Sequence, residues 1–484
     1  MRMWINGERV DSVSGQVIEV TNPATETTIE PVPAGVPADV ERAVAAAKDA
    51  FPGWRATTAV ERAQLLHQVA AKMRDHFDAL VELLTLEEGK PVPENEEELD
   101  WSINTFDYYA ELGRHIRGRV IPSPDAGQLN LVLKEPFGVV ACIVPWNYPI
   151  LLATWKIAAA LAAGNTVVLK PSTLAPLTLL RMVEVAFDEL PPGVINVITG
   201  RGGEIGDALV THPDVPVIAF TGSTAVGQRI ARLTADQMKK LHLELGGKDS
   251  FVIADDAPVE TAVEAVSYAA LINAGQVCTS TERVYVPRWM VSQFSELLAE
   301  RVSRLRMGPG IEPTTDIGPM IGEVERAHVE EHLADAVAKG ARVLVGGRRP
   351  TQFERGSFLE PAVLIDVDHS MRIMREETFG PTIPIMAYDT FDDAIALAND
   401  TDYGLGACLC SHDARKVRQF YEQVHAGTIW INDPLTDNYA GPFGGMKMSG
   451  LGRELGEEGI EEFWQTKHVH WDIDGGLKDY WYPY

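Results

Sequence analysis

Cys278 is the residue of this sequence whose type and setting best suit chemistry. It lies in the run Leu271 to Glu282, LINAGQVCTSTE, among small and polar neighbours. Gly275 disfavours continuation of the preceding helix, so we expect the thiol at the end of an element, where a nucleophile can be presented. The alternative is an inert buried thiol, which is the common fate of a single cysteine in a globular protein.

Polar residues also follow four short apolar runs that are rich in β-branched residues. Helical patterns separate these runs, which predicts βαβ units and a parallel sheet covered on both faces. Ligands bind at the carboxyl ends of such strands, so one cleft could collect all four polar segments. These segments are Asn147 with its neighbours, Lys170 to Thr173, Thr221 to Gly227, and Glu244 to Lys248.

The segment Thr221 to Gly227, TGSTAVG, has the composition of an anion-binding turn. A strand that turns through Gly222 and opens a helix, with Ser223 or Thr224 as the N-cap, would direct backbone N–H groups and the helix dipole at a pyrophosphate. The segment is not a full GxGxxG, and a glycine after a strand is more often only a turn. Both interpretations stay open on these residues alone.

Composition limits the class of protein. The 484 residues suffice for two or three domains, and 45% hydrophobic with 23% charged residues is usual for a globular protein. A net charge of −27 argues against a nucleic-acid partner. No apolar stretch approaches the roughly 20 residues that span a bilayer, and the N-terminus lacks the apolar region of a signal peptide. We therefore expect a cytoplasmic protein with no membrane partner.

The four cysteines, at 142, 278, 408 and 410, do not have the spacing of a zinc site, and we expect no metal. Cys408 and Cys410 are two residues apart in an apolar, strand-like run. Both are therefore expected in a core.

Periodicity predicts the elements that must position these residues. A hairpin over residues 1 to about 20 turns at Asn6-Gly7. Helices follow at 39–51, 59–88 and 94–116, and a strand pair leads into a buried strand that ends at Pro145. Strands then alternate with helices at 150–163, 176–189, 203–210 and 225–233.

A second α/β unit follows a boundary that we place near Gly246-Gly247. Its helices are predicted at 258–273, 289–305, 323–339, 390–399 and 413–424. The stretch Glu462 to Tyr484 is aromatic and ends in YWYPY. An apolar tail on an acidic chain docks on its own body or on a neighbouring subunit, and the second suggests an oligomer.

Seven motifs resemble, in order, the signature set of the NAD(P)-dependent aldehyde dehydrogenase superfamily. They are PWNYP at 145, KPS at 170, FTGST at 220, LELGGK at 243, GQVC at 275, EETFGP at 376 and PFGGMKMSGLGRE at 442. The resemblance implies an α/β fold of two domains, with a small β oligomerisation arm and a homodimer or homotetramer. The implied parts are a Rossmann-like cofactor domain (1–118 and 138–245), a catalytic domain (246–446), the arm and C-terminal tail (119–137 and 465–484) and a helical return (447–464).

The resemblance also implies catalytic roles. Cys278 matches the family's nucleophile, whose addition to an aldehyde gives an alkoxide that expels hydride. Asn147 matches the side chain that, with the Cys278 backbone N–H, donates to this oxyanion, although a turn residue before Pro149 is the alternative interpretation. Glu244 matches the general base that activates water against the thioester. Since CoA-acylating members lack this glutamate, a free carboxylic acid is the implied product.

For the cofactor, NAD or NADP, the resemblance implies a set of binding residues. Many NAD-preferring members have glutamate where Thr173 stands, and that carboxylate repels a 2′-phosphate. Threonine removes the repulsion, so we expect NADP to be tolerated, with Lys170 and Arg201 near the phosphate. The implied set is Trp146, Lys170, Ser172, Thr173, Arg201, Gly222, Ser223, Gly246, Glu377 and Phe379.

The implied substrate residues are Tyr148, Leu152, Trp155, Ile272 and Phe443, although aromatic residues at such helical spacing are usually core. Tyr148 and Trp155 are similar to part of the aromatic box of betaine and amino aldehyde dehydrogenases, which attracts a cation. Ile272 stands where betaine-specific enzymes tend to have another aromatic residue. An uncharged aldehyde therefore stays an equal alternative. Lys156 and Glu454 match a proposed proton route in relatives, and a structural ion pair explains them equally well.

Two other classes of function are alternatives to an aldehyde dehydrogenase. A cysteine hydrolase or esterase needs a histidine beside the thiol, and the nearest in sequence is His242, next to Glu244. A non-catalytic protein on the same fold predicts losses among Cys278, Glu244 and Asn147. All three are present, which favours the dehydrogenase.

Overall fold

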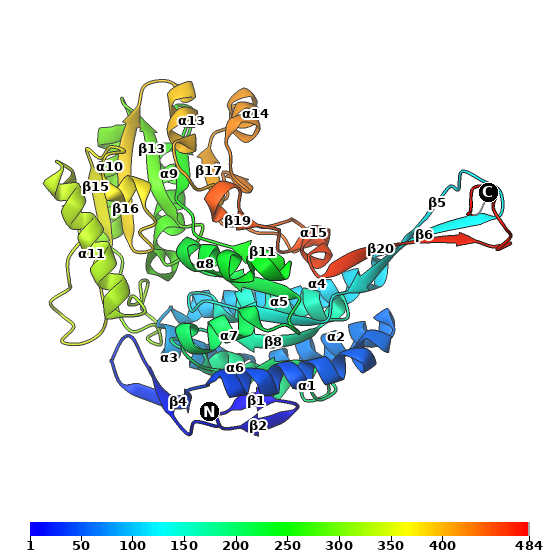
Figure 1. Ribbon diagram of the computed structural model, residues 1–484. Helices are drawn as coiled ribbons and strands as arrows, with labels where there is room; N and C mark the ends of the chain where they lie inside the picture. The colour runs from blue at the N-terminus through cyan, green and yellow to red at the C-terminus, as the bar shows by residue number, and fades with distance from the viewer. Residues whose placement is uncertain (483–484) are drawn as a thin grey trace.

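The computed structural model describes residues 1–482, which form two large sheets, a three-stranded sheet and a two-stranded sheet (Figure 1). The first large sheet has the order β19-β11-β10-β7-β8-β9-β1-β2. Its strands from β11 to β9 are parallel, and antiparallel strands close both edges. The strands are β1 (Met3–Ile5), β2 (Glu8–Val10), β7 (Val139–Ile143), β8 (Thr166–Lys170), β9 (Ile195–Val197), β10 (Val217–Thr221), β11 (Lys240–Glu244) and β19 (Gly450–Leu451).

Both faces of this sheet are buried, as alternation along β7 shows. Val140 and Cys142 join one apolar cluster, whereas Val139, Ala141 and Ile143 join another on the opposite face. This arrangement confirms the predicted parallel sheet, and it brings the segments after β7, β8, β10 and β11 to one edge. The covering helices are α1 (Pro37–Ala56), α2 (Ala59–Asp75), α3 (Phe77–Glu88), α4 (Val92–His115), α5 (Pro149–Ala162), α6 (Leu177–Ala186), α7 (Asp207–Thr211), α8 (Thr224–Thr234) and α15 (Gly456–Glu461).

The second large sheet has the order β14-β15-β16-β13-β12-β17-β18, and only β14 runs antiparallel to its neighbour. Cys408 and Cys410 are buried in β17, which confirms the prediction of a core position. Its strands are β12 (Asp249–Ile253), β13 (Thr281–Pro287), β14 (Arg342–Val345), β15 (Ala362–Ile365), β16 (Thr382–Tyr388), β17 (Gly406–Cys410) and β18 (Thr428–Ile431). The helices are α9 (Val259–Leu271), α10 (Val291–Ser303), α11 (Glu323–Ala338), α12 (Arg372–Arg375), α13 (Phe391–Asn399) and α14 (Ala414–Gln423).

The three-stranded sheet projects from the body as an arm (Figure 1). It consists of β5 (Arg119–Ile121), β6 (Gln128–Pro136) and β20 (Trp464–Asp472), and β20 pairs with β6 along its whole length. The exposed apolar side chains on and beside the arm include Val120, Trp471 and Tyr480. Of the predicted aromatic tail, Pro483 and Tyr484 lie outside the described residues.

Several local predictions were wrong. The predicted turn at Asn6-Gly7 is confirmed, and both residues have positive φ. The hairpin, however, ends at Val10 and not near residue 20, and β3 (Val17–Thr21) pairs instead with β4 (Thr28–Pro33). Helix α1 continues through Pro52 and Gly53 to Ala56. The predicted helix at 59–88 is two helices, which meet at His76. These errors concern ends and breaks of elements, which packing decides.

The segment 447–464 is helical only in part. It contributes β19 to the first sheet, antiparallel to β11, before the short helix α15. Within residues 1–482, no helix combines the length and apolarity needed to cross a bilayer.

Candidate active site

The backbone before Cys278 is held in an unusual conformation. Helix α9 ends at Leu271, and Asn273, Ala274 and Gly275 follow with φ values of 49°, 53° and 73°. Left-handed conformations at non-glycine residues cost free energy and persist only where contacts enforce them. Here the Asn273 N–H donates to Glu94 (2.8 Å), and a Cβ at Gly275 would lie 2.3 Å from the Gly380 carbonyl oxygen. The predicted end of the helix is thus a sharp, fixed turn.

This turn brings Cys278 to the place where two pockets meet. Cys278, Asn147 and Leu152 line both pockets. Burial raises the pKa of the thiol well above its usual value, and Glu244 raises it further. The thiol is therefore protonated at neutral pH until a base takes its proton.

Asn147 follows β7 and is held from several sides. Its side-chain Nδ2 donates to the Gln276 carbonyl oxygen (3.0 Å). Its own carbonyl oxygen accepts from Asn273 Nδ2 (2.9 Å) and Lys90 Nζ (3.3 Å). Since an amide nitrogen has two hydrogens, one remains for a ligand, and the bond to Gln276 fixes its direction.

Glu244 is the last residue of β11, and its side chain is buried. The Cys278 thiol lies within reach of its carboxyl group. Burial raises the pKa of Glu244 well above its usual value, and the nearby Glu454 carboxylate raises it further. A buried carboxyl group with a raised pKa that lines a pocket with a thiol has the properties of a general base.

The first pocket, called the dinucleotide-type pocket below, has a lining that suits a dinucleotide. Gly222 and Ser223 line it, and Ser223 caps α8, so a helix N-terminus lies beside it. Glu377 also lines it, held by the Gly247 N–H (3.2 Å), and burial raises the pKa of Glu377 to about 8. A Cβ at Gly246 would lie 2.4 Å from Glu377 Oε2, so a larger residue there would displace this carboxylate. The lining thus offers a helix N-terminus that could hold a phosphate and a carboxylate that could accept from hydroxyl groups, beside Trp146 and Phe379, whose rings are 5.6 Å apart.

The remaining predicted cofactor residues do not line this pocket. Ser172 and Thr173 follow β8, and Arg201 follows the neighbouring strand β9, at the same edge of the sheet. Lys170 is buried at the end of β8, and burial lowers its pKa to about 8. Its ammonium donates to the Pro171 carbonyl oxygen (3.2 Å). Sequence reasoning missed Glu325 and His328 of α11, which do line the pocket.

The second pocket, called the substrate pocket below, is lined by all five predicted substrate residues, namely Tyr148, Leu152, Trp155, Ile272 and Phe443. The rings of Trp155 and Phe443 are 5.1 Å apart. Sequence reasoning missed further lining residues, which adjoin the predicted ones or come from segments distant in sequence. They are Glu94, Glu97, Glu98, Trp101, Leu151, Tyr268, Val277, Thr279, Leu435, Thr436 and Asp437.

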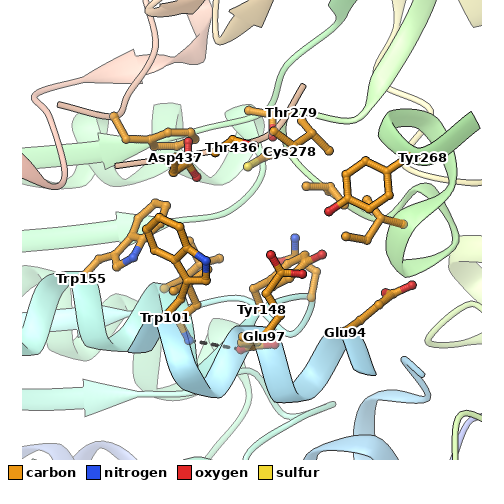
Figure 2. A pocket seen from close by; sticks show the side chains of 18 residues that line it. Glu94, Glu97, Trp101, Tyr148, Trp155, Tyr268, Cys278, Thr279, Thr436 and Asp437 are labelled. Atoms are coloured by element: carbon orange, nitrogen blue, oxygen red, sulfur yellow. Dashed lines mark hydrogen bonds between the residues drawn. The ribbon is translucent and has the colours of Figure 1, made fainter. Parts of the chain in front are cut away.

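Acidic side chains lie on two sides of this pocket, among aromatic ones. Figure 2 shows Glu94, Glu97 and Trp101 on the side opposite Cys278 and Asp437. The spacing of Glu94, Glu97, Glu98 and Trp101 puts them on one face of α4, a signal that was present in the sequence. It was not decisive, because an acidic helix face is usually solvated. Burial raises the pKa values of Glu94 and Asp437 to about 7.

Lys156 and Glu454 form a buried ion pair, and Lys156 also donates to Thr221 Oγ1. His242, the histidine considered for a hydrolase, is buried 4.0 Å from Glu454, and burial lowers its pKa well below its usual value. His328 lines the first pocket with Cys278, but its ring lies 3.1 Å from the Glu377 carbonyl oxygen. Among the described residues, no hydrogen bond joins a histidine to Cys278, and no group of three or more His, Cys, Asp or Glu side chains could hold a metal ion.

Comparisons with known proteins agree with this geometry. The sequence model of the "Aldehyde dehydrogenase family" matches residues 10–469. Succinate-semialdehyde dehydrogenase [NADP(+)] of Escherichia coli is 41% identical over 96% of both chains, and aminoaldehyde dehydrogenase 2 of Zea mays is 40% identical over 96% of this chain and 94% of that protein. The crystal structure of betaine aldehyde dehydrogenase from Staphylococcus aureus with NAD+ superimposes with a TM-score of 0.97, at 38% identity, over 99% of this chain and 96% of that one.

Likeness at this level extends over nearly the whole sequence and the whole fold. It confirms the resemblance that the seven motifs indicated and the predicted fold class. The chain therefore belongs to the aldehyde dehydrogenase family.

Proposed function

We propose that this enzyme oxidises aldehydes to free carboxylic acids through a covalent intermediate on Cys278. The observation that carries the proposal is the position of Cys278, which lines both the dinucleotide-type pocket and the acidic, aromatic pocket. A nucleophile shared by two pockets can hold an aldehyde carbon within reach of a redox cofactor. NAD or NADP is the cofactor, as in the family.

The side chains around Cys278 divide the chemistry among them. Glu244 takes the thiol proton as the sulfur adds to the aldehyde carbon, and the resulting oxyanion accepts from Asn147 Nδ2 and the Cys278 N–H. One such donor is worth roughly 3 kcal/mol. The bound nicotinamide supplies the acceptor for the hydride that leaves this carbon. Glu244 releases that proton to solvent and then takes one from water, which attacks the thioester. The adduct collapses to the acid and the Cys278 thiolate, which Glu244 protonates.

The cofactor choice is proposed to be permissive. Thr173 follows β8, beside the strand end that precedes Arg201, and it brings no charge to repel a 2′-phosphate. Thr173→Glu should therefore raise the KM for NADP about tenfold or more and leave the KM for NAD within threefold. Equal effects on both cofactors would contradict this role of Thr173.

For the substrate, the acidic pocket favours an aldehyde with a cationic end. Four carboxyl side chains line it, from Glu94, Glu97, Glu98 and Asp437, of which only Glu98 is paired with a buried lysine, and none of its described lining residues is Lys or Arg. Lys90 lies under the Tyr148 ring (3.6 Å), but it is fully buried and pairs with Glu88 and Glu98. Carboxylates attract a cation and repel a carboxylate-ended semialdehyde.

Sequence identity does not separate these substrate classes. The E. coli succinate-semialdehyde dehydrogenase and the maize aminoaldehyde dehydrogenase are 41% and 40% identical to this chain. The charge of the pocket is therefore the better guide, and it supports the cationic alternative over an anionic or uncharged aldehyde.

The test uses aldehydes of the same shape and different charge. Betaine aldehyde and 3,3-dimethylbutanal differ only in a quaternary nitrogen or carbon, and succinic semialdehyde supplies the anion. We expect kcat/KM to fall in that order, by roughly tenfold or more at each step. Succinic semialdehyde as the best of the three would refute the proposed substrate class while leaving the dehydrogenase reaction intact.

A pair of variants on α4 sharpens this test. Glu96 and Glu97 are both exposed, but only Glu97 lines the pocket. Glu97→Gln should raise the KM for betaine aldehyde by roughly threefold, and Glu96→Gln should leave it unchanged. Equal effects of the two would indicate long-range attraction rather than a contact in the pocket.

The arm is proposed to join subunits of a homo-oligomer. Val120, Trp471 and Tyr480 are exposed on or beside it in the single chain. Light scattering of the wild type and of Trp471→Glu tests this, because a charge in a subunit interface should reduce the molar mass. The predicted cytoplasmic location and division into domains stay predictions.

A further inference from the structure

A buried carboxylate lies behind the loop that carries Glu377 and Phe379. Glu282 belongs to β13, four residues after Cys278. Its carboxylate accepts from the backbone N–H of Thr378 (3.0 and 2.9 Å) and from that of Phe379 (2.7 Å). The Glu282 side chain thus binds two consecutive backbone N–H groups of the loop 377–379, which is called the cofactor loop below.

Lys248 completes this contact. Its ammonium donates to Glu282 Oε2 (2.5 Å) and to Thr378 Oγ1 (3.0 Å). The two side chains are 0% and 4% exposed, so neither charge would be stable there without the other. Because Lys248 lies four residues after Glu244, the pair joins the segments of the nucleophile, the base and the cofactor loop.

The conformation of the loop explains why a carboxylate is needed. Phe379 has a φ of 53°, in the left-handed region that a bulky side chain rarely adopts. Successive N–H groups that converge through a left-handed residue form an anion-binding concavity. Glu282 occupies this concavity, and the backbone held there points the side chains of Glu377 and Phe379 into the dinucleotide-type pocket.

We propose that Glu282, neutralised by Lys248, is a positioning residue for cofactor binding. It touches neither pocket. It acts by holding the 378–379 backbone in the conformation that lets Glu377 and Phe379 reach the nicotinamide half of the cofactor. This inference rests on the proposed cofactor role of those two residues.

The experiment compares two activities of the same full-length protein. Oxidation of betaine aldehyde requires NAD, whereas hydrolysis of p-nitrophenyl acetate is expected to use Cys278 and Glu244 without a cofactor. Glu282→Gln keeps one oxygen that can accept from both N–H groups, but it removes the charge and puts an NH2 group in place of the oxygen that Lys248 and the Thr378 N–H contact. It should raise the KM for NAD about tenfold. Its esterase rate should stay within twofold of wild type.

Two further variants make the result specific. Glu282→Asp keeps the charge but shortens its reach, and it should give a KM for NAD between wild type and Glu282→Gln. Thr378→Val removes only the hydroxyl group that Lys248 contacts and should change the KM less than twofold. If Glu282→Gln does not fold, Glu282→Asp decides: a raised KM for NAD with retained esterase activity supports the inference, and an unchanged KM overturns it.

Glu377→Gln separates a failure of this inference from a failure of the proposed function. If it raises the KM for NAD and Glu282→Gln does not, the positioning role is overturned while the role of Glu377 stands. If Glu377→Gln has no effect, its cofactor role fails, and this inference fails with it. A parallel loss of esterase and dehydrogenase activity in Glu282→Gln would make Glu282 a general structural residue and overturn the inference.

Discussion

The two pockets that meet at Cys278 are built in different ways. The dinucleotide-type pocket depends on backbone geometry, with glycine at 222 and 246 and a helix N-terminus behind Ser223. The substrate pocket is lined by side chains from α4, α5, α9 and the loop around Asp437. A pocket formed by backbone groups tolerates few substitutions. A pocket lined by side chains can change its shape and charge through single substitutions. Relatives of similar identity to this chain carry different substrate names.

The largest effect should come from the residue that both pockets share. Cys278→Ala should reduce turnover by roughly 10⁴-fold or more, because no other nucleophile lines the junction. Cofactor binding, measured by tryptophan fluorescence, should persist, since the backbone of that pocket is unaltered. Cys142→Ala is the matched control, because Cys142 is buried in β7 and lines neither pocket. Turnover within tenfold of wild type in Cys278→Ala would exclude the covalent mechanism.

Asn147 also lines both pockets, and a smaller loss is expected from its removal. Asn147→Ala should lower kcat by about 10²- to 10³-fold, since the oxyanion loses one donor. The dissociation constant for NAD should change little. If KM for the aldehyde rose while kcat stayed constant, Asn147 would serve ground-state binding instead.

Gly246→Ala should damage the cofactor pocket alone. The added Cβ would lie 2.4 Å from Glu377 Oε2, so the carboxylate must leave the Gly247 N–H. We expect the KM for NAD to rise about tenfold, with the esterase rate nearly unchanged. Gly203→Ala is the control, because a Cβ there meets nothing within 4 Å. Loss of the esterase rate in Gly246→Ala would show that the two pockets are not separable.

The smallest effect should be a dependence of the substrate pocket on pH. The pKa values of Glu94 and Asp437 are raised to about 7, so both groups gain negative charge as pH rises from 6 to 8. The KM for betaine aldehyde should therefore fall severalfold over this range, relative to that for 3,3-dimethylbutanal. The ratio of the two KM values cancels the titration of Cys278 and Glu244. A ratio that does not change with pH would mean that these carboxyl groups do not face the cation.

The sequence by itself determined the parts of this enzyme that depend on local pattern. Alternating strands and helices predicted the parallel sheet, and the turn at Gly275 predicted the presentation of Cys278. Asn147, Gly222 and Glu244 could be assigned to one cleft because parallel strands end at one edge. The ends of helices were less certain, as Pro52 inside α1 shows.

Only the tertiary structure decided the charge of the substrate pocket and the supports behind the site. Glu94 and Glu97 have the pattern of a solvated helix face until α4 is seen opposite Asp437. Likewise, the contact of Glu282 with Thr378 joins residues 96 positions apart. Tertiary contacts of this kind decide whether a charged side chain is solvated, binds a ligand or positions another segment. They depend on how distant segments pack, which no local pattern records.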